Sequence, residues 1–220
     1  MGDRSRALTW VRESGMFVLL VLLVATVFII PAVIPFGATL RLVDRVMLTL
    51  ILVSGVLAVA DHGRLAIALA AISFVVIAIA WAQAFLPMVT FAALRDIVAV
   101  GALLVLAFAV GINVFISGHA IGDRVFGAIV LYLLLGLTWA VAYQIAESMV
   151  PGSFTRSPDP DAGLSGWFYF SFVTLTTVGY GDIAPLTQPA RSLAILEALI
   201  GQLYPAIIIA RLVSLQVSSS

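Results

Sequence analysis

Residues 176–182, with the sequence TTVGYGD, form a glycine-rich run between two long apolar segments, 125–146 and 192–210. Irregular backbone at membrane depth is tolerated only where it is buried in protein or lines a water-filled path, because lipid offers no hydrogen-bond partners. Glycine carries no Cβ penalty at positive φ, so the backbone of Val178, Gly179 and Tyr180 can alternate between ordinary and left-handed conformations. Such alternation turns successive carbonyl oxygens toward one axis. The run therefore predicts a path through a bilayer that is lined by backbone oxygens.

The composition indicates a membrane protein. The chain has 220 residues, of which 63% are hydrophobic and 10% are charged. A soluble domain of this length does not need so much apolar surface, so the lipid bilayer is the expected solvent. The formal net charge is zero, which gives no indication of a nucleic-acid partner. The sequence contains no cysteine, which excludes disulfides and thiolate metal sites.

Apolar segments predict an all-α membrane protein with six transmembrane helices per chain. A helix needs about 20 residues to cross the hydrocarbon core. The second segment is short between charges, so Arg41 and Arg45 would have to extend their side chains to the headgroups. We expect a peripheral four-helix domain over residues 1–120 and a second domain over residues 121–220. The predicted spans are 15–36, 41–60, 65–85, 97–117, 125–146 and 192–210.

The region between the fifth and sixth segments predicts a re-entrant loop. Residues 147–165 form a long polar stretch, and the aromatic run 167–176 that follows is too short to cross a membrane. Its length fits a half-helix with Ser165 as the N-cap. The C-terminal end of such a helix places partial negative charge where a cation would wait. One copy of this loop encloses nothing and the chain contains no repeat of it, so a pore requires four identical chains.

At these residues the chain resembles the tetrameric potassium channels, and among them the bacterial six-helix channels. The resemblance is strong over residues 131–215 and only architectural over the first 120 residues. Residues 177–181 match the selectivity filter of the family at every position. The resemblance implies a homotetramer with a re-entrant pore helix and filter between helices 5 and 6. It also implies passive conduction of dehydrated potassium ions, with no enzymatic activity and no cofactor besides the permeant ion.

The resemblance assigns roles within the filter. The filter would consist of Thr177, Val178, Gly179, Tyr180 and Gly181. The carbonyl oxygens of the first four residues would coordinate potassium, and Thr177 would add its hydroxyl at the inner mouth. The ring of Tyr180 would point away from the pore axis and pack against aromatic residues of the pore helix.

Residues around the filter would support it. These residues are Thr176, Tyr169, Asp182 and Glu147. Tyr169 occupies a position where many relatives carry tryptophan, and its phenol can donate a hydrogen bond to Asp182. Glu147 resembles the acid that braces the outer filter in voltage-gated relatives. A solvated helix end is the alternative role for Glu147.

The sixth segment contains the candidates for the cavity and the gate. Gly201 lies where the family places the glycine hinge of the inner helix, and Pro205 removes a helical hydrogen bond, so we expect a bend. Gln202 would face a water-filled cavity. Close helix packing at a small residue is the alternative for Gly201. Glu197 is a lone acid in an apolar helix, for which we expect an interhelical hydrogen bond rather than a direct role in conduction.

The first four segments lack the pattern of a voltage sensor, which needs several arginines at every third position of one helix. Arg95 and Asp96 lie at the outer end of the fourth segment, and no charge follows them until Asp123. We therefore expect weak or no voltage dependence. We expect a multi-pass protein of the cell (plasma or inner) membrane with both termini cytoplasmic, an orientation to which the arginine count adds only a weak bias. We expect His62 and His119 to be solvated loop residues.

Other functions compete with this interpretation. A poorly selective cation channel is one alternative, although Tyr180 argues against it because relaxed filters often alter this position. A potassium carrier with a pore-like loop is another, but such carriers usually contain several degenerate loops within one chain. A membrane enzyme has little support, because the sequence has no clustered His or Cys and no paired acids at membrane depth.

Overall fold

The chain is helical over most of the part that the computed structural model describes, residues 15–34, 37–60, 63–85, 89–115, 121–159 and 163–218. The first helix, Gly15–Val33, contains the π-helical turn η1 (Ala25–Ile29) and ends with α2 (Ile30–Val33). The described ranges contain no β-strand, and Phe154 and Pro185 form an isolated antiparallel bridge. The later helices are α3 (Ala38–Ala58), α4 (Arg64–Phe85), α5 (Val89–Phe115), α6 (Ile121–Met149), α7 (Ser165–Leu175) and α8 (Gln188–Ser218).

Five helices of the described chain are long and apolar enough to cross a membrane, whereas the sequence predicted six. The difference lies in α3, which is helical as predicted for residues 41–60. The N-terminal part of this helix contains Arg41, Asp44 and Arg45. Charged groups near a helix end are costly to place in hydrocarbon, so this helix is less suited to crossing than the others. The candidate spans are Gly15–Val33, Arg64–Gln83, Leu94–Ile112, Arg124–Met149 and Gln188–Arg211.

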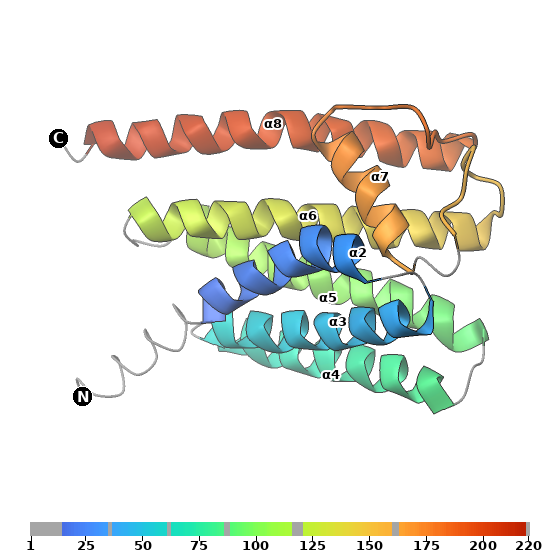
Figure 1. Ribbon diagram of the computed structural model, residues 1–220. Coiled ribbons are helices and arrows are strands. Elements are labelled where there is room, and N and C mark those ends of the chain that lie inside the picture. The colour runs from blue at the N-terminus through green and yellow to red at the C-terminus, as the bar shows by residue number, and fades with distance from the viewer. Residues whose placement is uncertain are drawn as a thin grey trace.

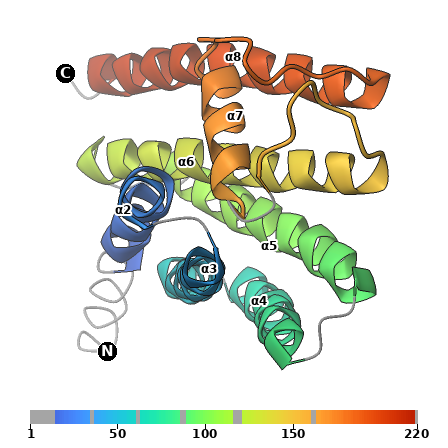
Figure 2. The same cartoon turned by 45° about the vertical axis from the view of Figure 1, so that its right-hand side comes forward.

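The helices form a layered bundle (Figure 1). Helix α6 packs against α5, α7 and α8, while α5 also packs against α4 and α3. Figure 2 shows α3 and α4 on the side of α5 that faces away from α8, with α7 crossing the space between α6 and α8. The glycine-rich run follows α7, so α6, α7 and α8 position the candidate site.

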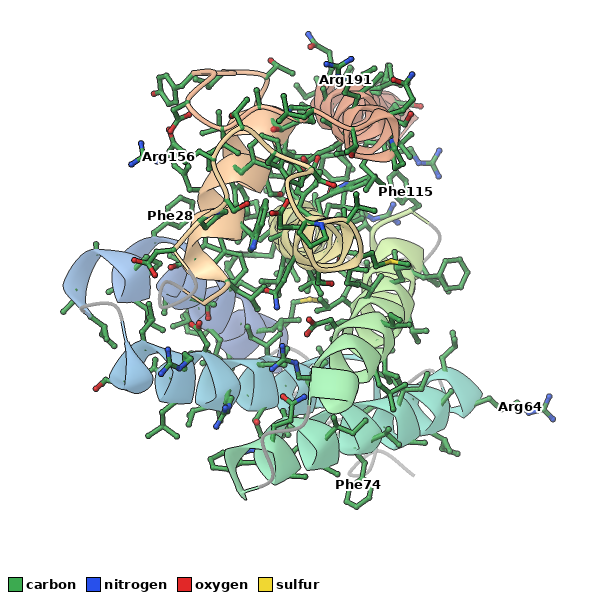
Figure 3. The ribbon with its side chains drawn as sticks, turned by 90° about the vertical axis from the view of Figure 1, so that its right-hand side faces the viewer. Phe28, Arg64, Phe74, Phe115, Arg156 and Arg191 are labelled. Carbon is green, nitrogen blue, oxygen red and sulfur yellow. The ribbon has the colours of Figure 1, made fainter. Side chains whose placement is uncertain are left out.

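The outer surface of the bundle is apolar. On α4, Ile67 and Phe74 are 71% and 73% exposed, and Figure 3 shows Phe74 and Arg64 pointing away from the other helices. A helix that is apolar on all sides is either buried in a large protein or surrounded by lipid. Because these side chains are exposed, lipid is the environment in which this surface is stable.

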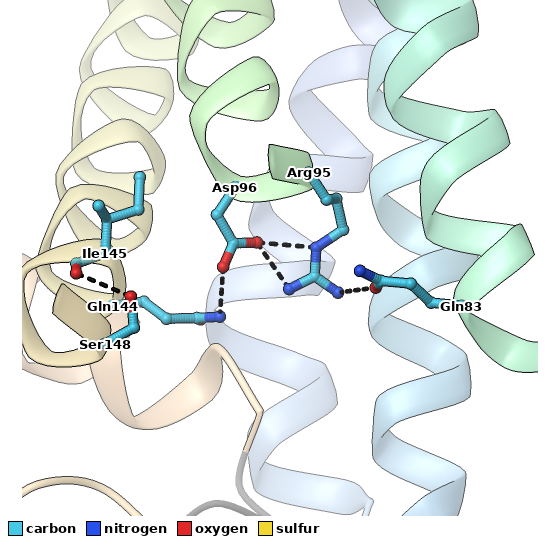
Figure 4. Close-up of polar contacts among 6 residues, drawn as sticks. All are labelled: Gln83, Arg95, Asp96, Gln144, Ile145 and Ser148. Atoms are coloured by element: carbon cyan, nitrogen blue, oxygen red, sulfur yellow. Dashed lines mark hydrogen bonds and ion pairs between the residues drawn. The ribbon is translucent and has the colours of Figure 1, made fainter. Parts of the chain in front are cut away.

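A polar cluster joins the peripheral helices to α6 (Figure 4). Arg95 donates hydrogen bonds to Asp96 (2.7 Å) and to Gln83 of α4 (2.9 Å), and it forms an ion pair with Asp96 at 2.6 Å. Gln144 of α6 donates to the other Asp96 oxygen at 3.0 Å. Asp96 is buried, so these contacts satisfy a carboxylate that would otherwise be costly to desolvate. The sequence located Arg95 but not this cluster, because Gln83 and Gln144 come from other helices than Arg95 and Asp96.

The start of α7 differs from the prediction. Leu164 is the N-cap residue and its side chain makes no cap hydrogen bond. Ser165 is the first residue of the helix, so the prediction of Ser165 as the N-cap was wrong by one position. The backbone N–H of Leu164 instead donates to the carboxylate of Asp44, which belongs to α3. A negative charge next to a helix N-terminus is favourable. The capping group therefore comes from a residue far away in sequence, which local patterns do not reveal.

Candidate ion-conducting site

The backbone after α7 alternates between two conformations. Thr177, Gly179 and Gly181 have φ values of 59°, 59° and 79°, and Val178 and Tyr180 between them do not have positive φ. The sequence predicted alternation around Gly179 but did not predict the left-handed conformation of Thr177. Among the described non-glycine residues, Thr177 alone has a positive φ. A β-branched residue in this region is strained, and such strain is typical of functional sites.

The amide groups at the start of this run donate hydrogen bonds to carbonyl groups of α7. The N–H of Thr177 donates to Thr174 O at 2.9 Å, and those of Val178 and Gly179 donate to Val173 O at 2.9 and 3.2 Å. In contrast, the carbonyl oxygens of residues 177–180 accept no hydrogen bond from any residue that the structure describes. These residues are also exposed in the single chain. The arrangement leaves a row of backbone oxygens available to another group.

Tyr169 of α7 lies beside the run and contacts two of its side chains. The rings of Tyr169 and Tyr180 are stacked, with centroids 6.5 Å apart and planes inclined by 3°. A side-chain hydrogen bond joins Tyr169 to Asp182, as the sequence suggested. This hydrogen bond raises the pKa of the Tyr169 phenol, so the phenol stays protonated and able to donate. Tyr169 thus contacts the run at Tyr180 and at Asp182.

Tyr169→Phe should preserve the ring stack and remove the hydrogen bond to Asp182. We expect little change in the stability of the folded protein, because Tyr169 is exposed in the single chain. Ion flux through reconstituted protein should decline faster than in wild type when external potassium is lowered. Tyr180→Phe is the matched control, since no hydrogen bond of the Tyr180 hydroxyl is present among the described residues. Equal decline in wild type and Tyr169→Phe would contradict a supporting role for this phenol.

Glu147 braces the loop after α6 rather than the run itself. Its carboxylate accepts hydrogen bonds from the N–H groups of Gly152 and Ser153, both at 3.0 Å, and from the hydroxyl of Ser157. The sequence predicted contact with the outer filter, with a solvated helix end as the alternative. Glu147 can therefore influence the filter only indirectly, through the loop that it stabilises.

This loop is in turn tied to the segment that follows the run. The N–H of Thr155 donates to Ala184 O at 2.8 Å, and the N–H of Leu186 donates to Ser153 O at 2.7 Å. The Thr155 hydroxyl accepts a further hydrogen bond from the N–H of Ala184 at 2.9 Å. The two segments thus hold each other, and the backbone run is anchored at both of its ends.

Helix α8 packs closely against the end of α7 at Gly201. A Cβ atom on Gly201 would lie 1.8 Å from the carbonyl oxygen of Leu175. Helix α8 is also continuous from Gln188 to Ser218, with Pro205 inside it. The close-packing alternative for Gly201 is therefore present in the structure, and α8 is not broken at the predicted hinge. Gln202 and Pro205 are exposed in the single chain.

Glu197 lies one turn before Gly201 and is completely buried. It contacts Tyr143 of α6 and Ser171 of α7, which is the interhelical hydrogen bonding that the sequence favoured. The described residues contain no group of three or more His, Asp or Glu side chains that could hold a metal ion. His62 and His119 lie outside the described residues.

Comparison with known proteins identifies the part of the chain that contains these features. A family model described as "Ion channel" matches residues 125–217, which include most of α6, all of α7, the glycine-rich run and most of α8. The match assigns an ion channel domain to this part of the chain, and the apolar helices support a multi-pass membrane protein. No solved structure matches the chain at a significant level.

Several named relatives are similar to part of this chain. Two pore potassium channel c of Oryza sativa subsp. japonica is 39% identical over 84 residues, which are 38% of this chain and 18% of that protein. Protein LctB of Geobacillus stearothermophilus is 41% identical over 86 residues (37% and 62%). Inward rectifier potassium channel Kirbac3.1 of Paramagnetospirillum magnetotacticum is 40% identical over 77 residues (33% and 23%). Two of these relatives are named potassium channels, and the family model that matches residues 125–217 is described as an ion channel. The chain spans less than two thirds of each of these relatives.

Proposed function

We propose that four copies of this chain form a potassium-selective channel around the backbone run 177–181. The observation that carries the proposal is the alternation of φ at Thr177, Gly179 and Gly181, with amides bonded to α7 and carbonyl oxygens left unpaired. Rings of such oxygens replace the hydration shell of potassium. Adjacent ions in successive rings repel each other, which drives passive conduction without any catalysed reaction.

Exposure of the run supports an oligomer. Val178 and Tyr180 are 53% and 72% exposed in the single chain. Their unpaired backbone oxygens cannot face lipid, because each unsatisfied group there costs several kcal/mol. Closed symmetry with four copies places these oxygens around a shared axis and covers the exposed apolar face of α8, which includes Ile195 and Leu199. In this proposal α3 completes six crossings, so that both termini lie in the cytoplasm. Helix α7, the proposed pore helix, points its C-terminal end toward the ion.

Potassium flux into proteoliposomes, measured against sodium flux and with barium as blocker, tests the proposal. We expect potassium uptake that follows the potassium gradient, exceeds sodium uptake and is blocked by barium. A reversal potential that ignores the potassium gradient would favour a poorly selective cation channel. Single-channel currents too small for a pore would favour a carrier.

Voltage should have little effect on the open probability. The one arginine near the outer end of α5 is paired with Asp96, so movement of the pair transfers no net charge across the membrane field. Each unpaired charge would contribute about 2.3 kcal/mol per 100 mV, and steep gating needs several per subunit. Recordings in planar bilayers should therefore show a shallow relation between conductance and voltage. Steep activation would show that the outer helices carry gating charge.

A further inference from the structure

A buried carboxyl group connects the three helices that hold the proposed filter. Glu197 of α8 has 0% exposure. Its Oε2 accepts a hydrogen bond from the Tyr143 hydroxyl of α6 at 2.5 Å, and its Oε1 lies 2.5 Å from Ser171 Oγ of α7. Ser171 Oγ also lies 2.8 Å from the carbonyl oxygen of Gly136 in α6.

The hydrogen atoms available to this cluster determine its charge. A serine hydroxyl has one hydrogen, so it can donate to Gly136 O or to Glu197 but not fully to both. A backbone carbonyl can only accept, so the short contact to Gly136 is favourable only if Ser171 donates to it. The contact between Ser171 and Glu197 then needs a hydrogen on Glu197. With the proton on Glu197 Oε1, all three contacts are hydrogen bonds.

The surroundings of Glu197 favour the same state. It forms no ion pair with any arginine that the structure describes. An isolated carboxylate is far more costly to bury than a neutral carboxylic acid, and a group in such a place takes up a proton instead. The partners that it has are hydroxyl groups, which suit a neutral acid.

A second contact between α7 and α8 lies one helical turn away from this cluster. Ser171 and Leu175 are one turn apart on α7, and Glu197 and Gly201 are one turn apart on α8. The pair Ser171–Glu197 is hydrogen-bonded, and the pair Leu175–Gly201 is in close backbone contact. The filter begins two residues after Leu175, and its first amides bond to the last carbonyls of α7. A shift of α8 at this position therefore moves the base of the filter.

We propose that Glu197 is held in its neutral, protonated form and acts as a positioning residue that locks α7, and with it the filter, to α8. The effect on ion selectivity rests on the proposed channel function. The protonation state does not, because it follows from the hydrogen bonds alone.

Infrared spectroscopy of the reconstituted wild-type protein tests the protonation state directly. We expect a carboxylic acid C=O band in wild type that shifts in deuterated water and disappears in Glu197→Gln. Glu147→Gln is the matched control and should keep the band, because Glu147 contacts the loop after α6 and is not part of this cluster. A wild-type spectrum with no band that depends on Glu197 would overturn the proposal.

Flux measurements test the positioning role. In Glu197→Gln the amide can donate to Ser171 and accept from Tyr143, so we expect selectivity close to that of wild type. Glu197→Ala and Ser171→Ala should each lower potassium-over-sodium selectivity about tenfold, because each leaves a buried polar partner unsatisfied. A selective Ser171→Ala channel, or an unselective Glu197→Gln channel, would contradict the role. If wild type itself is unselective, the channel proposal fails while the infrared result still stands.

Discussion

Gly179→Ala should abolish potassium flux and leave the oligomer assembled. Gly179 has a φ of 59°, and no atom of its own chain lies within 4 Å of the position that a Cβ would occupy. The alanine therefore meets no clash within its chain. Its cost is conformational, about 1–2 kcal/mol for an L-residue in the left-handed region. That energy is small compared with the stability of a domain, but it favours a flip of the peptide that turns a carbonyl oxygen away from the axis.

Flux into proteoliposomes and the mass of the purified oligomer measure the two parts of this prediction. Gly152→Ala is the matched control. Gly152 also has a positive φ, 82°, and no neighbouring atom within 4 Å of a Cβ, but it lies in the loop after α6. The control carries a comparable backbone penalty outside the filter and should conduct normally. Undiminished flux in Gly179→Ala would defeat the assignment of the filter.

Gly201→Ala should destabilise the assembled protein strongly. The new Cβ would lie 1.8 Å from Leu175 O and 2.7 Å from Leu175 C, and both are backbone atoms that no rotamer change can move. Either α7 or α8 must shift, at a cost of roughly 3 kcal/mol or more. We expect the thermal midpoint of the oligomer to fall by about 10 °C. The remaining folded protein should also lose selectivity, because α7 carries the filter.

Gly101→Ala on α5 separates this effect from the general effect of removing a helical glycine. No atom lies within 4 Å of a Cβ at Gly101, so alanine there should stabilise the helix by up to about 1 kcal/mol. If Gly201 served only as a hinge, Gly201→Ala would keep the stability of wild type and change only the opening of the channel. That outcome would contradict the close-packing interpretation.

Local patterns predicted much of this molecule. Apolar segments located the long helices, with ends that differ from the observed ones by up to eight residues, and the aromatic run located α7. The pair Tyr169–Asp182 followed from the resemblance and from the donor capacity of a phenol. These features depend on residues that are close together in the sequence or on a motif that is itself contiguous.

Two features that sequence reasoning missed depend on distant residues. Asp44 of α3 contacts the N-terminus of α7, and Asp96 links α5 to Gln144 of α6. In both cases tertiary contacts select a partner that propensities do not encode. The left-handed Thr177 is a local feature that contradicts its own preference and is held by a hydrogen bond to Thr174 of α7.

The hydrogen bonds between residues 177–179 and the end of α7 have a mechanical consequence. Val173 O accepts from two successive amides and Thr174 O from a third, so the helix end and the ribbon after it behave as a single body. Emptying the ribbon of ions cannot let it relax independently, since three N–H groups would lose their acceptors where water is scarce. Any loss of conduction that originates here should therefore require the last turn of α7 to unwind, which amide exchange of Val173 to Gly179 would report.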